Sequence, residues 1–327
     1  MSSLRNHFEQ ILESAGVQVN GSNPWDITVH NEELFSRISR DGTVGLGEAY
    51  MDGWWDCESI DEMITRSFRA GLEDKIRSNF KFFIYLIGLR LMNRQSESRA
   101  FQVAEQHYDI GNDIFERMLD KHMNYSCGFW ESATCLEDAQ MAKMEMICEK
   151  LQLERGMKVL EIGCGWGALA RWMSQRYGVS VTGITVSKEQ AKLARSRCAG
   201  LPVSIELADY RALNGEYDRI VSVGMLEHVG QKNYRTYFAK ARSLLKDQGL
   251  FLLHTIGAGR EGFATDRWIE KYIFPNGVLP PADALAKTAG EFFTIEDWHN
   301  FGADYDPTLM AWYKNFNRSW IDLKASY

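Results

Sequence analysis

Residues 158–185 read KVLEIGCGWGALARWMSQRYGVSVTGIT, and this stretch decides the fold. An apolar run at 158–162 enters a glycine-rich turn at 163–167, which is followed by a helical pattern at 168–177 and a second apolar run at 179–185. Strand, helix and strand joined by short connections are typical of a parallel sheet with right-handed crossovers. The stretch therefore predicts the first unit of a doubly wound α/β sheet.

The same alternation continues downstream of this unit. The pattern predicts further strands at 203–207, 219–223 and 250–254 and further helices at 188–198 and 233–245. Ligands of doubly wound sheets bind outside the carboxyl ends of the strands. We therefore expect the functional residues in the loops that follow the strands.

The first hundred residues have a different pattern. Helical spacing at 4–15, 60–70 and 76–92 surrounds a short strand near 27–29 and a glycine-rich stretch at 42–53. The polar run NRQSESR at 93–99 interrupts the pattern and predicts a linker. The expected organisation is a small, mainly helical N-terminal domain at 1–92, a linker at 93–100 and a catalytic domain at 101–327.

Charge is unevenly distributed along the 327 residues. The net charge of -7 excludes a generally basic nucleic-acid-binding protein, yet residues 65–100 carry eight Lys and Arg against three acidic residues. Phenylalanines and isoleucines are interleaved with these basic residues, which favours docking on an anionic membrane surface. The alternative is a helix that belongs to the core of the small domain and has a solvated basic face.

The cysteines and the N-terminus indicate a cytoplasmic protein. The six cysteines form no CxxC pair, so neither a metal site nor a disulfide framework is predicted. The N-terminus lacks the apolar core of a secretion signal, and the longest apolar run, 82–89, is much shorter than the roughly 20 residues that span a bilayer. The sequence thus predicts a cytoplasmic protein, and the basic segment predicts peripheral attachment to the inner face of the membrane.

The turn at 163–167 has the spacing Gly-x-Gly-x-Gly. A dinucleotide-binding loop has its third glycine one residue further on, and a phosphate-binding loop ends in Gly-Lys-Ser/Thr, which is absent. An adenosyl cofactor without a pyrophosphate can bind close to this turn, because its glycines carry no side chains. The alternative is a simple strand-to-helix corner.

Eight blocks of sequence carry a family resemblance. The blocks are EQHYDIGND at 105–113, YSC at 125–127, VLEIGCGWG at 159–167, GITVS at 183–187, GMLEHVG at 224–230, LHTIG at 253–257, YIFPNG at 272–277 and DWHNFGADY at 297–305. With these blocks the chain resembles the cyclopropane-fatty-acyl-phospholipid synthases, within the class I S-adenosylmethionine-dependent methyltransferases.

The resemblance implies transfer of a methylene group from S-adenosylmethionine to the cis double bond of an unsaturated acyl chain in a membrane phospholipid. It also implies a set of cofactor contacts. These are Tyr125, Ser126, Gly163, Cys164, Gly165, Thr185, Gln190 and Tyr210. Thr185 stands where related methyltransferases carry an acidic residue for the ribose, so Thr185 and Gln190 are expected to bind it with neutral groups. The Cys164 side chain is expected to fill space, and Tyr125, Trp166, Tyr210 and Trp268 are either core residues or aromatic neighbours of a cation.

The reaction needs a base for the methyl group that is added to the alkene, and a site from which water is excluded. The family resemblance implies a bound bicarbonate ion, and the matching positions are Cys127, Glu227, His254, the backbone of Ile256, and Tyr305. Because a carboxylate repels an anion unless they share a proton, we expect Glu227 and the ion to hold one between them.

The sequence leaves two alternative functions open. The same fold serves methyl transfer to another lipid or an amine without ring closure. The family pattern also continues beyond the block at 310–313, so the resemblance implies a C-terminal truncation and, as a second alternative, an inactive lipid- or cofactor-binding protein. The resemblance further implies a homodimer, in which two lipid-binding units would strengthen attachment to one membrane.

Overall fold

A computed structural model describes residues 2–72, 111–258 and 266–325. The described parts of Met1–Asn93 and Thr265–Phe274 form one compact unit, and those of Arg94–Ala264 and Pro275–Tyr327 form a second. The predicted helix at 76–92 and the linker at 93–100 lie outside the described residues, as do most of the basic segment 65–100 and most of the block at 105–113.

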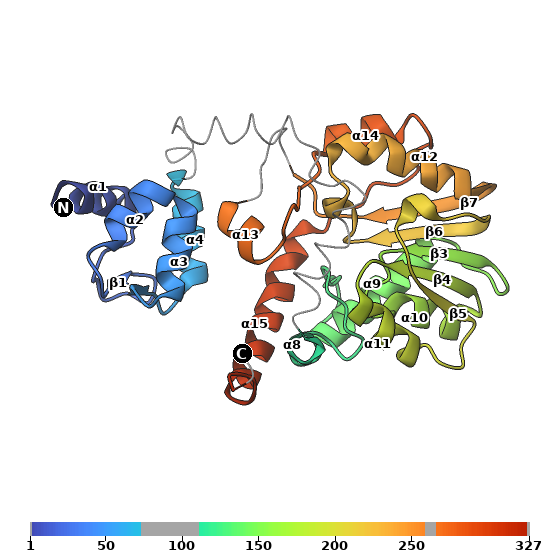
Figure 1. Cartoon of the computed structure of the whole chain (residues 1–327), viewed down its shortest axis with the longest axis horizontal. Helices are drawn as coiled ribbons and strands as arrows, with labels where there is room; N and C mark the ends of the chain where they lie inside the picture. Colours follow the sequence, from blue (N-terminus) through green and yellow to red (C-terminus); the bar gives the residue numbers. More distant parts are fainter. Residues whose placement is uncertain (1, 73–110, 259–265, 326–327) are drawn as a thin grey trace. The chain divides into compact units, whose positions relative to one another are not determined.

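A five-stranded parallel sheet is the centre of the second unit, with strand order β5-β4-β3-β6-β7 (Figure 1). The strands are β3 (Lys158–Ile162), β4 (Ser180–Thr185), β5 (Val203–Leu207), β6 (Tyr217–Val223) and β7 (Leu245–His254). The chain starts at β3, moves outward to β5 and returns through β6 to β7. This order confirms the predicted doubly wound α/β fold.

Helices cover both faces of the sheet, and the central strand β3 is buried on both sides. Leu160 and Ile162 of β3 share a core with Tyr237 and Phe238, whereas the neighbouring Val159 packs in a separate core. The first core is closed by α12 (Tyr234–Leu244) and α14 (Ala282–Ala289), and the second by α9 (Leu136–Lys150) and α10 (Ala168–Tyr177). Helix α11 (Lys188–Arg197) packs against β4 and β5. The alternation of side chains along a strand produces this division.

Strand β7 begins at Leu245, well before the predicted position 250. Its pairing with β6 is irregular there, since Tyr217 opposes Leu245 whereas Arg219 opposes Leu250. Residues 246–249 read KDQG and show no alternation of apolar and polar side chains. The sequence pattern therefore predicts only the C-terminal part of β7, from residue 250 on.

The first unit is mainly helical, as expected. Its helices are α1 (Ser2–Glu13), α2 (Leu34–Asp41), α3 (Thr43–Met51) and α4 (Ile60–Arg69), and β1 (Thr28–Val29) pairs with β2 (Trp55–Asp56). Val17, Ile27, Leu34, Ala49, Trp55 and Met63 form its buried core.

The glycine-rich stretch 42–53 contains a helix, α3, that the pattern did not predict. Its glycines permit close approach, because a Cβ on Gly45 would lie 2.5 Å from the Arg37 carbonyl oxygen and one on Gly47 would lie 2.3 Å from the Trp268 ring. The ring belongs to α13 (Arg267–Tyr272), a later segment that is part of this unit. Trp268 is therefore a packing residue of the first unit.

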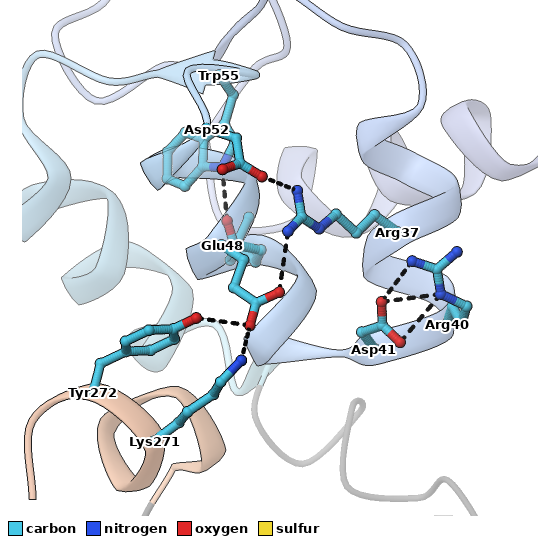
Figure 2. Close-up of polar contacts among 9 residues, drawn as sticks. Arg37, Arg40, Asp41, Glu48, Asp52, Trp55, Lys271 and Tyr272 are labelled. Atoms are coloured by element: carbon cyan, nitrogen blue, oxygen red, sulfur yellow. Dashed lines mark hydrogen bonds and ion pairs between the residues drawn. The ribbon is translucent and has the colours of Figure 1, made fainter.

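Glu48 of α3 is the centre of a polar cluster that holds α13 (Figure 2). Its carboxylate accepts hydrogen bonds from Lys271 Nζ at 2.5 Å, from the Tyr272 hydroxyl at 2.9 Å and from the Arg37 guanidinium at 3.0 Å. Arg37 also donates to Asp52 at 2.6 Å. These donors lower the pKa of Glu48 to about 2, because they stabilise its ionised form.

We predict that Glu48 stabilises the first unit in a pH-dependent manner. A depressed carboxyl pKa contributes stability above the ordinary Glu value near 4.5, and this contribution is lost as the pH falls toward about 2. The melting temperature of Glu48→Gln should lie below that of the parent at pH 6, and the gap should narrow at pH 3 to 4. Asp41→Asn, which removes an exposed pair with Arg40, is the control and should change little at either pH. A gap for Glu48→Gln that is independent of pH would contradict the assignment.

Candidate active site

The loops after β3, β4, β6 and β7 lie at one edge of the sheet, because the strands are parallel. The turn after β3 is tight: the amides of Gly163 and Cys164 both donate to the Ile184 carbonyl, at 3.0 and 2.8 Å. Gly163, Gly165 and Gly167 have φ values of 85°, 52° and 80°, which disfavour residues with a side chain. The structure therefore requires the glycine spacing that the sequence shows.

A cavity, here called the loop cavity, lies beside this turn. It brings together five of the expected cofactor residues, namely Tyr125, Ser126, Gly163, Cys164 and Gly165. The Cys164 side chain packs with Ala191 and Ala194 of α11, as expected for a space-filling thiol. Tyr125 packs between the rings of Phe115 and Trp312, at centroid distances of 5.4 and 5.2 Å, and its burial raises its pKa to about 12.

Helix α9 fixes Ser126 at two points. Gln140 Nε2 donates to the Ser126 carbonyl oxygen at 2.8 Å, and Lys143 Nζ donates to Ser126 Oγ at 2.7 Å. Both side chains are buried, and they stand three residues apart on the same face of the helix. The position of Ser126 is thus determined by α9.

The remaining expected cofactor residues do not line the loop cavity. Thr185 Oγ1 donates to Gln190 Oε1 at 2.8 Å at the end of β4, so the structure brings these two neutral residues together. Tyr210 lies in the core against Tyr237, with ring centroids 5.1 Å apart. Among these three residues, only Thr185 and Gln190 contact each other through polar atoms.

Glu227 and Ile256 meet directly. The Ile256 amide donates to Glu227 Oε1 at 2.7 Å, and the Glu227 carbonyl oxygen accepts a hydrogen bond from Val278 N at 2.8 Å. Glu227 is buried, which raises its pKa and favours its protonated form. The Ile256 amide is expected to face a bound anion, but in the structure this amide donates its hydrogen bond to the Glu227 carboxyl group instead.

His254, at the end of β7, stacks on Phe301 with ring planes 7° apart and centroids at 5.3 Å. Burial, reinforced by the positive charge of Lys143, lowers the pKa of His254 to about 3, so its imidazole is neutral at physiological pH. Burial likewise raises the pKa of the Cys127 thiol to about 11. Burial is the main cause of the raised pKa of Tyr305, which lies near Glu227 and Cys127. These pKa shifts favour the neutral forms of all four groups.

Helix α15 (Tyr305–Leu323) is tied to the Cys127 segment through Thr308. Thr308 Oγ1 accepts hydrogen bonds from Gly128 N at 3.1 Å and Trp130 Nε1 at 2.8 Å, and donates to the Asp304 carbonyl oxygen at 2.7 Å. A hydroxyl three residues beyond Tyr305 therefore fixes this end of α15 beside Cys127.

Thr308→Val should lower the free energy of unfolding by about 2–4 kcal/mol, because it leaves two donors without their acceptor at a fully buried position. Urea denaturation measures this loss. Thr288→Val in α14 is the control, since it removes only a donor to a helix carbonyl and should cost less than about 1 kcal/mol. Equal losses in the two variants would show that Thr308 is not a structural anchor.

Sequence reasoning missed three residues that organise this site. Lys143 and Thr308 are described above, and the buried Asp120 accepts hydrogen bonds from His122 N at 2.9 Å and Asn124 N at 2.7 Å, which shapes the turn before Tyr125. An acidic residue shortly before an Asn is a recognisable turn signal for Asp120. Neither Lys143 nor Thr308 has such a signal.

Comparisons with known proteins give the family of the chain. The family model of mycolic acid cyclopropane synthetase matches residues 95–327. The cyclopropane-fatty-acyl-phospholipid synthase of Escherichia coli strain K12 is 54% identical over 318 residues, which cover 97% of this chain and 83% of that protein. Tuberculostearic acid methyltransferase UfaA1 of Mycobacterium tuberculosis is 31% identical over 331 residues, covering 94% of this chain and 77% of that protein.

A solved structure is also similar. The structure of mycolic acid cyclopropane synthase CmaA1 complexed with SAH and CTAB has a TM-score of 0.62 at 32% identity, over 66% of this chain and 82% of that chain. The sheet and its glycine turn define a class I methyltransferase that uses S-adenosylmethionine. The chain belongs to the mycolic acid cyclopropane synthetase family. Both the expected fold class and the expected family are confirmed.

Proposed function

We propose that this enzyme transfers a methylene group from S-adenosylmethionine to the cis double bond of unsaturated acyl chains in membrane phospholipids, with bound bicarbonate as the base. The observation that carries the proposal is the proximity of Tyr305 to Glu227 and Cys127, with Ile256 donating to Glu227. His254 ends the neighbouring strand β7 at the same edge of the sheet. The similarity to the Escherichia coli protein supports the phospholipid substrate.

The residues fit the cofactor. The glycine turn leaves its backbone accessible at the loop cavity, and the buried Glu161 places in that cavity a carboxyl group whose Oε2 has no hydrogen-bond partner in the described residues. Tyr125, Ser126, Gly163, Cys164 and Gly165 would hold S-adenosylmethionine at the loop cavity, and Thr185, Gln190 and Tyr210 are proposed as further contacts. The bound cofactor supplies the electrophilic methyl group.

The residues also fit bicarbonate. Within the described ranges, Glu227 Oε2 and His254 Nδ1 are buried polar atoms without a hydrogen-bond partner. A neutral imidazole and a protonated carboxyl group accommodate an anion without charge repulsion, and the raised pKa of Glu227 favours that protonation. Bound bicarbonate supplies the base for the proton that the added methyl group must lose.

The chain itself has two tasks in this reaction. Glu227 holds a proton at Oε2 while the Ile256 amide fixes Oε1, so the carboxyl group is oriented toward the cluster. Phe115, Trp166 and Trp312 pack with Tyr125 in one apolar cluster, which would exclude water from this side of the site. Water exclusion protects a carbocation from hydroxylation.

Methyl transfer to a lipid without ring closure is the second candidate. It is favoured by the similarity to a tuberculostearic acid methyltransferase. Cysteine, glutamate, histidine and tyrosine are nevertheless all present at the proposed anion site. We therefore place ring formation first.

Peripheral attachment to a membrane is part of the proposal. No helix in the described ranges is long and apolar enough to cross a membrane. Helix α4 exposes Ile64 and Phe68, which are one helical turn apart, and Arg69 adds a positive charge. We propose that α4 and the basic segment 65–100 dock on anionic lipid and that the enzyme acts as a homodimer on the inner face of the membrane.

The function is tested by incubating the purified chain with methyl-labelled S-adenosylmethionine and vesicles of cis-monounsaturated phospholipid. Label should enter the lipid, and depletion of bicarbonate should reduce the rate. Vesicles of saturated phospholipid are the control and should take up none. Cofactor binding without transfer would instead indicate an inactive binding protein, and transfer that is insensitive to bicarbonate would refute the proposed base.

Docking predicts that Phe68→Ser weakens vesicle binding. Phe68 is 61% exposed, and burial of such a side chain in lipid contributes about 1.5–3 kcal/mol, so the partition coefficient should fall about tenfold or more. Flotation with anionic vesicles measures the bound fraction. Ile321→Ser removes an apolar side chain of α15 that is 71% exposed and serves as the control. Equal binding of the Phe68 variant and the parent would refute docking through α4.

A further inference from the structure

Lys143 is a buried cation that the proposed mechanism does not use. Its side chain is 2% exposed, and Ser126 Oγ is a hydrogen-bond acceptor for its Nζ at 2.7 Å. Burial lowers the pKa of Lys143 to about 8, and the neighbouring Asp120, Cys127 and Glu161 act in the opposite direction. An ammonium group is costly to bury unless a charge or a ligand compensates it.

Glu161 places a carboxyl group in the same cavity as Lys143. Lys143, Glu161 and Ser126 all line the loop cavity. Burial raises the pKa of Glu161 to about 8, the Ala170 amide and Lys143 oppose the rise, and Glu161 Oε2 lacks a hydrogen-bond partner in the described chain. A cavity lined by one buried amine and one buried carboxyl group is complementary to a zwitterion, whose two charges favour the ionised forms of both groups.

The amino-acid end of S-adenosylmethionine is such a zwitterion, with an α-carboxylate and an α-ammonium group. Because Lys143 donates to Ser126 Oγ, the serine hydroxyl hydrogen is directed elsewhere and can donate to a second acceptor. A carboxylate that receives the serine hydrogen also benefits from the nearby positive charge.

We infer that Lys143 positions Ser126 and supplies the positive charge that binds the α-carboxylate of the cofactor's amino-acid tail. This inference rests only on the cofactor part of the proposed function. Lys143 is thus a positioning residue for the methyl donor, held on α9 one turn after Gln140, which fixes the Ser126 backbone.

The test compares two ligands that differ in the tail. Isothermal titration of the full chain gives dissociation constants for S-adenosylhomocysteine, which has the amino-acid tail, and for 5′-methylthioadenosine, which lacks it. In Lys143→Met the affinity for S-adenosylhomocysteine should fall at least about tenfold, while the affinity for 5′-methylthioadenosine stays unchanged. Lys150→Met removes a partly exposed lysine from the same helix and should change neither constant.

A second variant tests the route through Ser126. Ser126→Ala should also weaken S-adenosylhomocysteine binding, and the double variant with Lys143→Met should lose less than the sum of the two single losses. If both ligands lose affinity equally in Lys143→Met, the lysine is only structural and the inference is wrong. The inference is also wrong if the ratio of the two constants does not change.

One further measurement covers the case in which the Lys143 variant does not fold. If Lys143→Met fails to fold, the parent chain is titrated with decarboxylated S-adenosylhomocysteine, which should bind at least about tenfold more weakly than S-adenosylhomocysteine; equal affinity would overturn the inference. These assays contain neither lipid nor bicarbonate. A failure of ring formation with intact discrimination between the ligands would therefore refute the proposed function and leave the role of Lys143 supported.

Discussion

Replacement of Glu227 by Gln should lower kcat about 100-fold or more, while the affinity for S-adenosylhomocysteine stays at the level of the parent. The amide keeps the shape of the carboxyl group, and its oxygen can still accept the Ile256 hydrogen bond, which is 2.7 Å long in the parent. Its NH2 group can donate to an anion, but it cannot exchange a proton at physiological pH. Binding of S-adenosylhomocysteine and of the anion should thus survive, while proton transfer by residue 227 is lost.

The rate is measured as label transferred to unsaturated vesicles at saturating cofactor and bicarbonate. Glu291→Gln is the matched control, because Glu291 forms an exposed ion pair with Arg235 in the same unit. The control should retain the parent rate. A near-normal kcat for Glu227→Gln would show that Glu227 does not hold the proton.

Gly165→Ala should weaken S-adenosylhomocysteine binding about tenfold to 100-fold. Gly165 lines the loop cavity with φ of 52°, and a Cβ there would meet no protein atom within 4 Å, so the space beside it is available to the cofactor. A methyl group in that space clashes with the ligand, and overpacking of this kind costs about 1–3 kcal/mol. Titration calorimetry measures the change.

Gly156→Ala separates this clash from backbone strain. Gly156 also has a positive φ, 87°, and open space at its Cβ, but it lies in an exposed turn before β3. Both variants should lose a similar amount of unfolding free energy, about 1–2 kcal/mol, from the left-handed backbone. If Gly165→Ala binds S-adenosylhomocysteine as tightly as Gly156→Ala does, the cofactor does not approach the turn at Gly165.

The sheet could be predicted because its signals are local. The apolar run at 158–162, the turn at 163–167 and the helix at 168–177 are contiguous, and the structure places β3 and α10 at the predicted residues. Parallel strands then carry the following loops to one edge by topology alone. The fold class therefore predicts that the loops after β3, β6 and β7 lie close together.

The side-chain network could not be predicted, because it depends on contacts between distant segments. Lys143 stands in an ordinary helical sequence, and its burial follows only from the packing of α9 under Ser126. The Ile256 amide is engaged by Glu227, although these residues are far apart in the chain. Helix α13 packs on α3 because Gly47 leaves room for Trp268, a complementarity that no periodicity reveals.

The central claim is that a methylene group, and not a methyl group, enters the lipid. It is tested by mass spectrometry of the acyl chains after incubation with S-adenosylmethionine whose transferred methyl group carries three deuterium atoms. Formation of a cyclopropane ring requires loss of one of these deuterium atoms, so the account predicts a product that has gained a carbon with two. A product that retains all three would show methyl transfer without ring closure and would contradict the account.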